Sequence, residues 1–226
     1  MARLIPHSLK LAALGTIVLW LAGCGTVIQT PDIVMGDSFR PVNFHRGADQ
    51  LPPQIRRVAL LPLAATALGG GTDTGMETLQ PVLASELGKT RLFEVVPISS
   101  EQLRRWTGKE TWTAEEPLPR NFLERVRTDS GCDAVMFARL TVYHPYPPPA
   151  LGWSIKLVDG VDGRVWWSID EVFDAAEPTV TNGARRYSQQ HLQQHSAAPD
   201  SRAILQSPSR FGQYTLSTAF STLPAR

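Results

Sequence analysis

The most strongly patterned stretch of the chain is DAVMFARLTVYHPYPPPALGWSIKLVDGVDGRVWWSIDEVF, residues 133–173. It holds three runs rich in β-branched and aromatic residues, at 133–143, 151–158 and 164–173, and turn-forming residues separate them. The sequence DGVDG at 159–163 accepts positive φ, which favours a tight hairpin between the second and third runs. The stretch therefore predicts an antiparallel meander of three strands.

Side-chain alternation assigns the two faces of this meander. Trp166 and Trp167 are adjacent, so their side chains must point to opposite faces of a strand. The favoured interpretation is that helices cover both faces and that every tryptophan lies in the core. Alternatively, one tryptophan face contacts a partner. Residues 144–150 contain four prolines and predict a stiff, extended, exposed loop.

The loop and its neighbouring aromatic residues form the candidate partner surface. Aromatic side chains dominate the binding hot spots of protein interfaces. An exposed tryptophan beside the proline-rich loop is therefore the first place to expect a partner. The candidate contact residues are Tyr143, His144, Tyr146, Trp153 and Trp166.

The residues before the meander predict alternating strands and helices. The continuous apolar run at 56–63 is typical of a strand buried on both faces, which needs helices on both sides. A second strand is predicted at 92–97, and helices are predicted near 79–87, 99–106 and 122–131. The predicted fold class is α/β (α+β), a mixed sheet of about five strands with an antiparallel meander, flanked by helices.

Length and composition suggest one domain with tails, because about 200 mature residues rarely form two full domains. We predict an α/β sheet domain at 55–175 and a C-terminal helical extension at 176–226 that packs on it. Residues 24–54 contain four prolines and no sustained apolar period, which predicts a flexible tether of about 30 Å as a coil and under about 105 Å at full stretch. Alternatively, apolar residues within 27–35 let part of it pack onto the domain or a partner.

The N-terminus is typical of a secretory signal. Arg3 and Lys10 precede the apolar run at 11–21, about half the roughly 20 residues that a membrane-spanning helix needs. The run ends in LAGC at 21–24, which resembles the lipobox of bacterial lipoproteins. The alternative is an ordinary secretory signal that leaves Cys24 as a free thiol.

The lipobox resemblance implies a location. It implies cleavage of the signal peptide, residues 1–23, and lipid on Cys24, and two or three acyl chains suffice for stable anchoring. In the sorting rule of lipoproteins from double-membraned bacteria, Asp after the cysteine favours the inner membrane. Gly25 therefore implies the outer membrane, with the domain facing the periplasm.

Charge and cysteine content argue against a nucleic-acid partner and against an intrachain disulfide. The chain has 22 basic and 21 acidic residues, and the signal peptide contains two of the basic ones, which leaves 20 against 21. A nearly neutral chain of this kind is not expected to have the basic surface of a nucleic-acid binder. With Cys24 lipidated, Cys132 has no partner for an intrachain disulfide and is predicted to be a small buried hydrophobe.

The sequence gives only weak signals for a catalytic or ligand-binding site. His191 and His195 are four apart, but nothing completes a zinc site, and a solvated helix explains them better. The glycines at 69–71 lack the rest of a phosphate-binding loop. Turn or strand-surface roles explain the acidic residues Asp159, Asp162, Asp170 and Glu171 better than acid–base catalysis. We predict no enzyme activity, metal or cofactor.

A family resemblance rests on the order of five features: the lipobox, the tether, RVALLPL at 57–63, FEVVP at 93–97 and GCDAV at 131–135. The chain resembles envelope lipoproteins with the curli-secretion-lipoprotein and penicillin-binding-protein-activator type of α/β domain, and it is similar to the N-terminal domain of TolB. The resemblance covers roughly 55–175 and implies a role in envelope assembly, secretion or activation. Two departures are the lack of long amphipathic hairpins for a secretion pore and the lack of a matching synthase-binding surface.

The predicted function is that of an outer-membrane-anchored, periplasm-facing lipoprotein that binds another envelope protein without catalysis. Its expected partners are the membrane, through Cys24, and an envelope protein. The alternatives are an oligomeric secretion-channel component and a lipid-tethered periplasmic hydrolase. Titratable groups clustered in a deep cleft would favour the hydrolase, whereas a shallow, aromatic, uncharged surface would favour the binding role.

Overall fold

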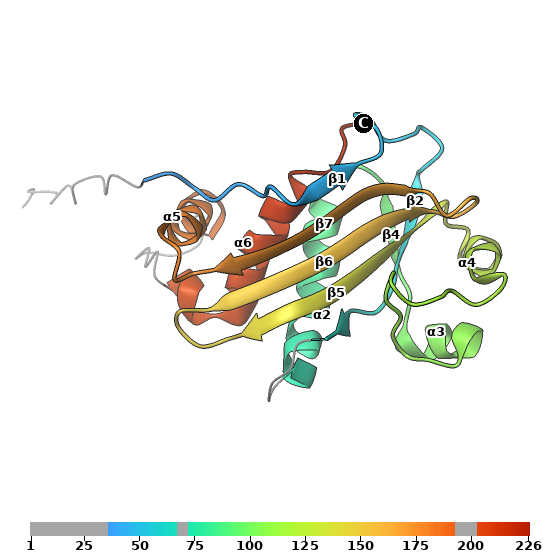
Figure 1. Ribbon diagram of the computed structural model, residues 1–226, viewed down its shortest axis with the longest axis horizontal. Helices are drawn as coiled ribbons and strands as arrows, with labels where there is room; N and C mark the ends of the chain where they lie inside the picture. Colours follow the sequence, from blue (N-terminus) through green and yellow to red (C-terminus); the bar gives the residue numbers. More distant parts are fainter. Residues whose placement is uncertain (1–35, 67–71, 193–202) are drawn as a thin grey trace, which may run out of the picture. The chain divides into compact units, whose positions relative to one another are not determined.

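The computed structural model describes residues 36–66, 72–192 and 203–226. In these ranges the strands are β1 (Phe44–Arg46), β2 (Arg57–Leu60), β3 (Ala64–Ala65), β4 (Glu94–Pro97), β5 (Ala134–His144), β6 (Ala150–Asp159) and β7 (Val165–Asp174). The helices are α2 (Thr72–Lys89), α3 (Ser100–Thr107), α4 (Phe122–Ser130), α5 (Pro178–Tyr187) and α6 (Pro208–Phe220), with a π-helical turn at Ser188–Leu192 and a 3-10 turn at Ala203–Gln206. The predicted α/β class is confirmed (Figure 1).

The sheet is mixed, and its strand order is β1-β7-β6-β5-β2-β4, with β3 pairing with β5. β5, β6 and β7 pair antiparallel in chain order, which confirms the predicted meander. β2 runs parallel to both of its neighbours, β4 and β5. The strands beyond the five expected are β1 and β3, with three and two residues. Such short strands show no readable alternation of apolar and polar residues.

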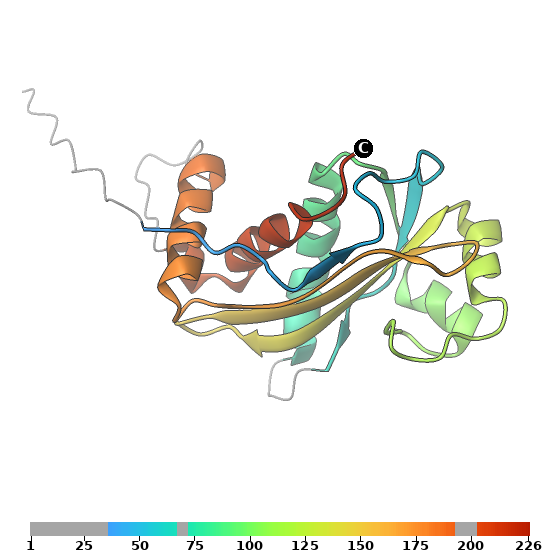
Figure 2. The ribbon, with the colours of Figure 1, turned by 45° about the horizontal axis from the view of Figure 1, so that its top comes forward.

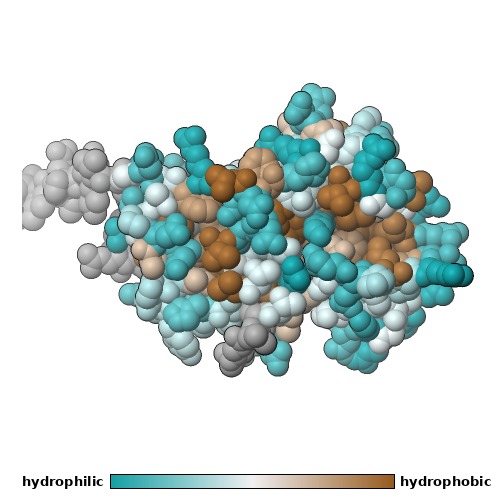
Figure 3. Space-filling model, in the orientation of Figure 1, coloured by the Kyte–Doolittle hydropathy of each residue, from teal (hydrophilic) through white to brown (hydrophobic). Residues whose placement is uncertain are grey.

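Helices cover the two faces of the sheet unequally. α2, α5 and α6 cover one face, where their apolar side chains surround Trp153 and Trp167. α3 and α4 pack on the other face, where Leu103 and Phe122 join Phe137 of β5 in a second apolar cluster. Figure 2 shows α3 and α4 at one end of the strands, away from α5 and α6. Seen from the side of the strands, the surface has apolar side chains among polar ones (Figure 3).

Cys132 belongs to the cluster beneath α3 and α4 and is almost fully buried. Burial raises the pKa of its thiol, because the thiolate would lose its hydration. The prediction that Cys132 is a small buried hydrophobe is confirmed.

Part of the segment predicted as a tether belongs to the domain. β1 pairs antiparallel with β7, with Phe44 opposite Ile169. Leu51 is buried, and its backbone N–H donates to the carbonyl of Ala225 at 2.7 Å. The sequence does not predict this pairing, because every β1 side chain is exposed and the strand therefore has no apolar pattern. The stretch from Cys24 to Gly36 is 12 positions long, so it spans at most about 43 Å.

Glu171 fastens this N-terminal segment to the sheet. Its Oε1 accepts hydrogen bonds from the backbone N–H groups of Val42 and Asn43, at 2.5 and 2.6 Å. The side chain was expected on the strand surface, but Glu171 is only 9% exposed. Its position in β7 alternates with exposed residues, so it faces the core side, where the incoming chain covers it.

Glu171→Ala is expected to loosen this segment without unfolding the sheet. The change leaves two backbone N–H groups without their charged acceptor, so we expect a loss of about 1–3 kcal/mol in local stability. Amide hydrogen exchange at Val42 and Asn43, measured by NMR, should accelerate accordingly. Asp170→Ala is the matched control, because Asp170 is the exposed neighbour on the same strand. Equal exchange rates in the two variants would contradict the role assigned to Glu171.

Candidate functional site

The β5–β6 loop, Pro145–Pro149, is held at both ends. Nδ1 of His144 lies 3.1 Å from the carbonyl oxygen of Pro148 and donates to it in the Nδ1-protonated tautomer. The N–H of Ala175 donates to the carbonyl of Pro149 at 2.9 Å. Proline rings fix φ, so the loop has little freedom left to lose on binding. The loop is therefore a rigid platform at the end of the meander (Figure 1).

Two tyrosines, one near the end of β5 and one within the loop, lie in different environments. Tyr146 is 75% exposed, the second most exposed large apolar or aromatic side chain of the described residues after Val42. Tyr143 is partly buried against α2, and a Cβ at Gly75 would lie 2.8 Å from its ring, so a larger residue at position 75 would force the ring to shift. Burial, and secondarily Tyr146, raises the pKa of the Tyr143 hydroxyl. That hydroxyl therefore stays protonated and can donate a hydrogen bond.

A shallow groove of about 360 Å³ lies between this loop and the helices beside it. Its walls come from the start of α2, the end of β5, the loop, the 3-10 turn and the first residue of α6. The lining residues are Thr74, Tyr143, Pro145, Tyr146, Pro147, Gln206 and Pro208. None of them carries a charge. We call this feature the Tyr146 groove.

The sequence predicted both tyrosines of this groove, but it did not predict the residues of the opposite wall. Thr74, Gln206 and Pro208 come from elements far from the loop in sequence, and no local signal marks them as binding residues. His144 does not line the groove, although it braces the loop.

The structure separates the tryptophans from the groove. Trp153 is completely buried, and its Nε1–H donates to Oγ1 of Thr215 at 2.9 Å. Its expected role as a partner contact is a wrong prediction, because α6 covers that face. Trp166 is partly buried against the same apolar cluster, and its Nε1–H donates to Asp159. It lies at the opposite end of β7 from the loop, since Leu157 pairs with Trp167, whereas Ala150 pairs with Asp174 beside the loop.

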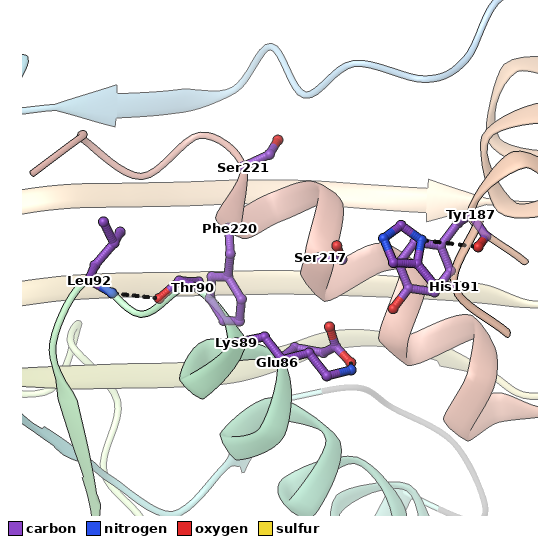
Figure 4. A pocket seen from close by; sticks show the side chains of 9 residues that line it. All are labelled: Glu86, Lys89, Thr90, Leu92, Tyr187, His191, Ser217, Phe220 and Ser221. Carbon is purple, nitrogen blue, oxygen red and sulfur yellow. Dashed lines mark hydrogen bonds and ion pairs between the residues drawn. The ribbon is translucent and has the colours of Figure 1, made fainter. Parts of the chain in front are cut away.

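A second, larger pocket of about 600 Å³ lies between α2, the C-terminal end of α5 and α6 (Figure 4). It is lined by Glu86, Lys89, Thr90, Leu92, Tyr187, His191, Ser217, Phe220 and Ser221. Four of these side chains are titratable, the feature that a hydrolase would require.

The titratable groups of this pocket are paired with one another. Glu86 is only 3% exposed, and its carboxylate lies 2.6 Å from the ammonium of Lys89. Burial and then Glu86, through its charge and a hydrogen bond, raise the pKa of the Tyr187 hydroxyl. The His191 ring stacks on Tyr187, with centroids 4.5 Å apart. Its one hydrogen bond among the described residues joins Nδ1 to the carbonyl of Tyr187, so those residues contain no nucleophile–histidine pair at this pocket.

The remaining candidates add no site. Cys24, His195 and the glycines at 69–71 lie outside the described residues. In the ranges that the structure covers, no three His, Cys, Asp or Glu side chains come together as metal ligands. Asp159 accepts hydrogen bonds from the N–H groups of Val161 and Asp162, which is the turn role expected for it. No helix among the described residues is long and apolar enough to cross a bilayer.

Comparison by sequence finds no match: no family model matches the chain, and no curated protein does. Several solved structures are similar in fold. The PelC dodecamer from Paraburkholderia phytofirmans matches with a TM-score of 0.46 and 15% identity, over 83% of this chain and 96% of that chain. Lipoprotein GNA1162 from Neisseria meningitidis matches with a TM-score of 0.36 and 19% identity, over 52% and 79%.

TolB from Acinetobacter baumannii also matches, with a TM-score of 0.28 and 12% identity, over 70% of this chain and 32% of that chain. Identities this low leave the function of the present chain to its own residues.

Proposed function

We propose that this chain is an outer-membrane lipoprotein, anchored through Cys24, that binds another envelope protein through the Tyr146 groove and catalyses no reaction. The observation that carries the binding role is the groove itself, which is shallow, uncharged, lined by aromatic and proline rings, and built on a rigid loop. Exposed tyrosines on rigid supports are typical of interface hot spots. The LAGC sequence at 21–24 supports the anchor.

The proposed anchor limits the distance between the domain and the membrane. Because residues 36–54 belong to the domain, only the 12 positions between Cys24 and Gly36 separate it from the lipid. That stretch spans at most about 43 Å, less than half of the reach expected for the whole predicted tether. A partner that is itself bound to or embedded in the same membrane fits this limit.

The experiment is photocrosslinking in intact cells with a photoreactive phenylalanine at position 146. We expect an adduct with one envelope protein, identified by mass spectrometry. Position 161 is the matched control, because Val161 is also strongly exposed but lies in the hairpin turn at the opposite end of the meander. Replacing Tyr146 by Ser and Pro147–Pro149 by Gly should abolish the adduct partner's co-purification while leaving the melting temperature unchanged.

Three results would count against the proposal. Equal adducts from positions 146 and 161 would show nonspecific contact. Unchanged partner recovery after the loop replacement would remove the groove from the interface. A ladder of adducts at multiples of the chain's own mass would support the oligomeric secretion component instead.

A further inference from the structure

We propose that the Tyr146 groove binds an uncharged, proline-containing segment of the partner in the polyproline II conformation. The inference rests on the proposed function, because it names the kind of partner segment that the groove accepts. It goes further by specifying the conformation and composition of that segment.

The shape and composition of the groove fit flat, apolar rings. Tyr143 and Tyr146 provide two aromatic faces, and Pro145, Pro147 and Pro208 complete the walls. Grooves of this kind recognise polyproline II segments, in which every third residue lies on the same side of an extended helix. With no charged lining residue, the groove offers nothing to compensate a charge on the ligand.

The hydrogen-bonding groups of the groove favour the same ligand. Thr74, Tyr143, Tyr146 and Gln206 carry hydroxyl or amide donors, and none of these side chains has a hydrogen-bond partner within the described residues. A polyproline II backbone forms no internal hydrogen bonds and therefore presents free carbonyl acceptors. Proline also lacks an N–H group, so a proline-rich ligand buries no unpaired donor in this groove.

Strand addition is a second way in which a peptide can bind at this end of the sheet. β6 is paired along both sides by β5 and β7, whereas β5 is paired by β2 and β3 only as far as Leu140. An added strand would bind through the backbone of β5, but the groove itself is lined by rings and side-chain donors. An uncharged ligand held by those rings and donors is the occupant that the lining favours.

Peptide binding to the unlipidated chain tests this inference separately from the envelope experiment. The sample is the mature chain with Cys24→Ser, which retains every described residue, and the probe is an acetylated, amidated peptide of ten prolines. We expect saturable NMR shifts at Thr74, Tyr146 and Gln206. Tyr146→Ala should weaken binding about tenfold, as for removal of one hot-spot side chain. Val161→Ala is the control that should leave the affinity unchanged.

The overturning results are equally specific. Absence of saturable binding, equal binding of a glycine–serine peptide of the same length, or an unchanged affinity in Tyr146→Ala would each refute the inference. So would dimerisation of the chain through the groove in place of peptide binding. A crosslinked partner at position 146 without decaproline binding would refute this inference alone. Decaproline binding without any partner adduct would refute the proposed function and leave the groove chemistry intact.

Discussion

Cys24→Ala is expected to abolish labelling of this protein by a palmitate analogue completely. The proposed lipid would be attached through the cysteine of the LAGC sequence, and alanine has no sulfur to accept it. The only other cysteine, Cys132, is almost fully buried beneath α3 and α4 and has a raised thiol pKa, so it cannot substitute for Cys24. The variant should also leave the membrane fraction, because stable anchoring needs the acyl chains. Metabolic labelling followed by gel fluorescence and fractionation measures both effects.

The Cys24 prediction has an internal control. Cys132→Ala removes the second cysteine and should retain full labelling, since Cys132 serves only as a buried side chain. Labelling that survives in Cys24→Ala would disprove lipidation at this position. Absence of labelling in the unaltered chain would support the ordinary secretory signal, with Cys24 as a free thiol.

Trp153→Ala is expected to reduce the free energy of unfolding by about 3–5 kcal/mol. Trp153 is completely buried under α6, so truncation leaves a cavity as well as removing apolar contact. The indole N–H also donates to Thr215, which loses that partner. Because domains of this size are typically stable by about 5–15 kcal/mol, this loss is a large fraction of the total stability. Urea denaturation followed by circular dichroism measures the change.

Two controls separate burial from other effects. Val172→Ala lies on the same meander but is 45% exposed, so its stability should change by less than about 0.5 kcal/mol. Trp153→Phe keeps an aromatic ring and loses the hydrogen bond, so its loss should be intermediate. If Trp153→Ala lost less than Trp153→Phe, the packing of α6 described here would be incorrect.

The meander could be predicted because the alternation of side chains along a strand involves only neighbouring residues. Alternation in Leu151, Trp153, Ile155 and Leu157 places these residues on one face in any sheet, and the DGVDG turn sets the pairing of β6 with β7. The parallel strand β2 was predictable for a related reason, since its apolar run requires cover on both faces.

The sequence could not show which helix covers which face of the sheet. For this reason Trp153 was wrongly predicted as a partner contact. Trp153 and an exposed tryptophan have the same local pattern, and only the packing of α6 buries Trp153. The same limit applies to residues 36–54, whose attachment depends on the buried carboxylate of Glu171 far along the chain. Long-range pairing of this kind has no period in the sequence.

The sequence alone predicted the secretory signal, the lipid site at Cys24, the meander and the proline-rich loop, because each of these depends only on neighbouring residues. The Tyr146 groove depends on tertiary structure, because Thr74, Gln206 and Pro208 reach the loop only when α2 and α6 pack on the sheet. The length of chain left between the anchor and the domain likewise depends on β1 joining β7. Contacts between distant segments arise from burial in three dimensions, which no short stretch of sequence encodes.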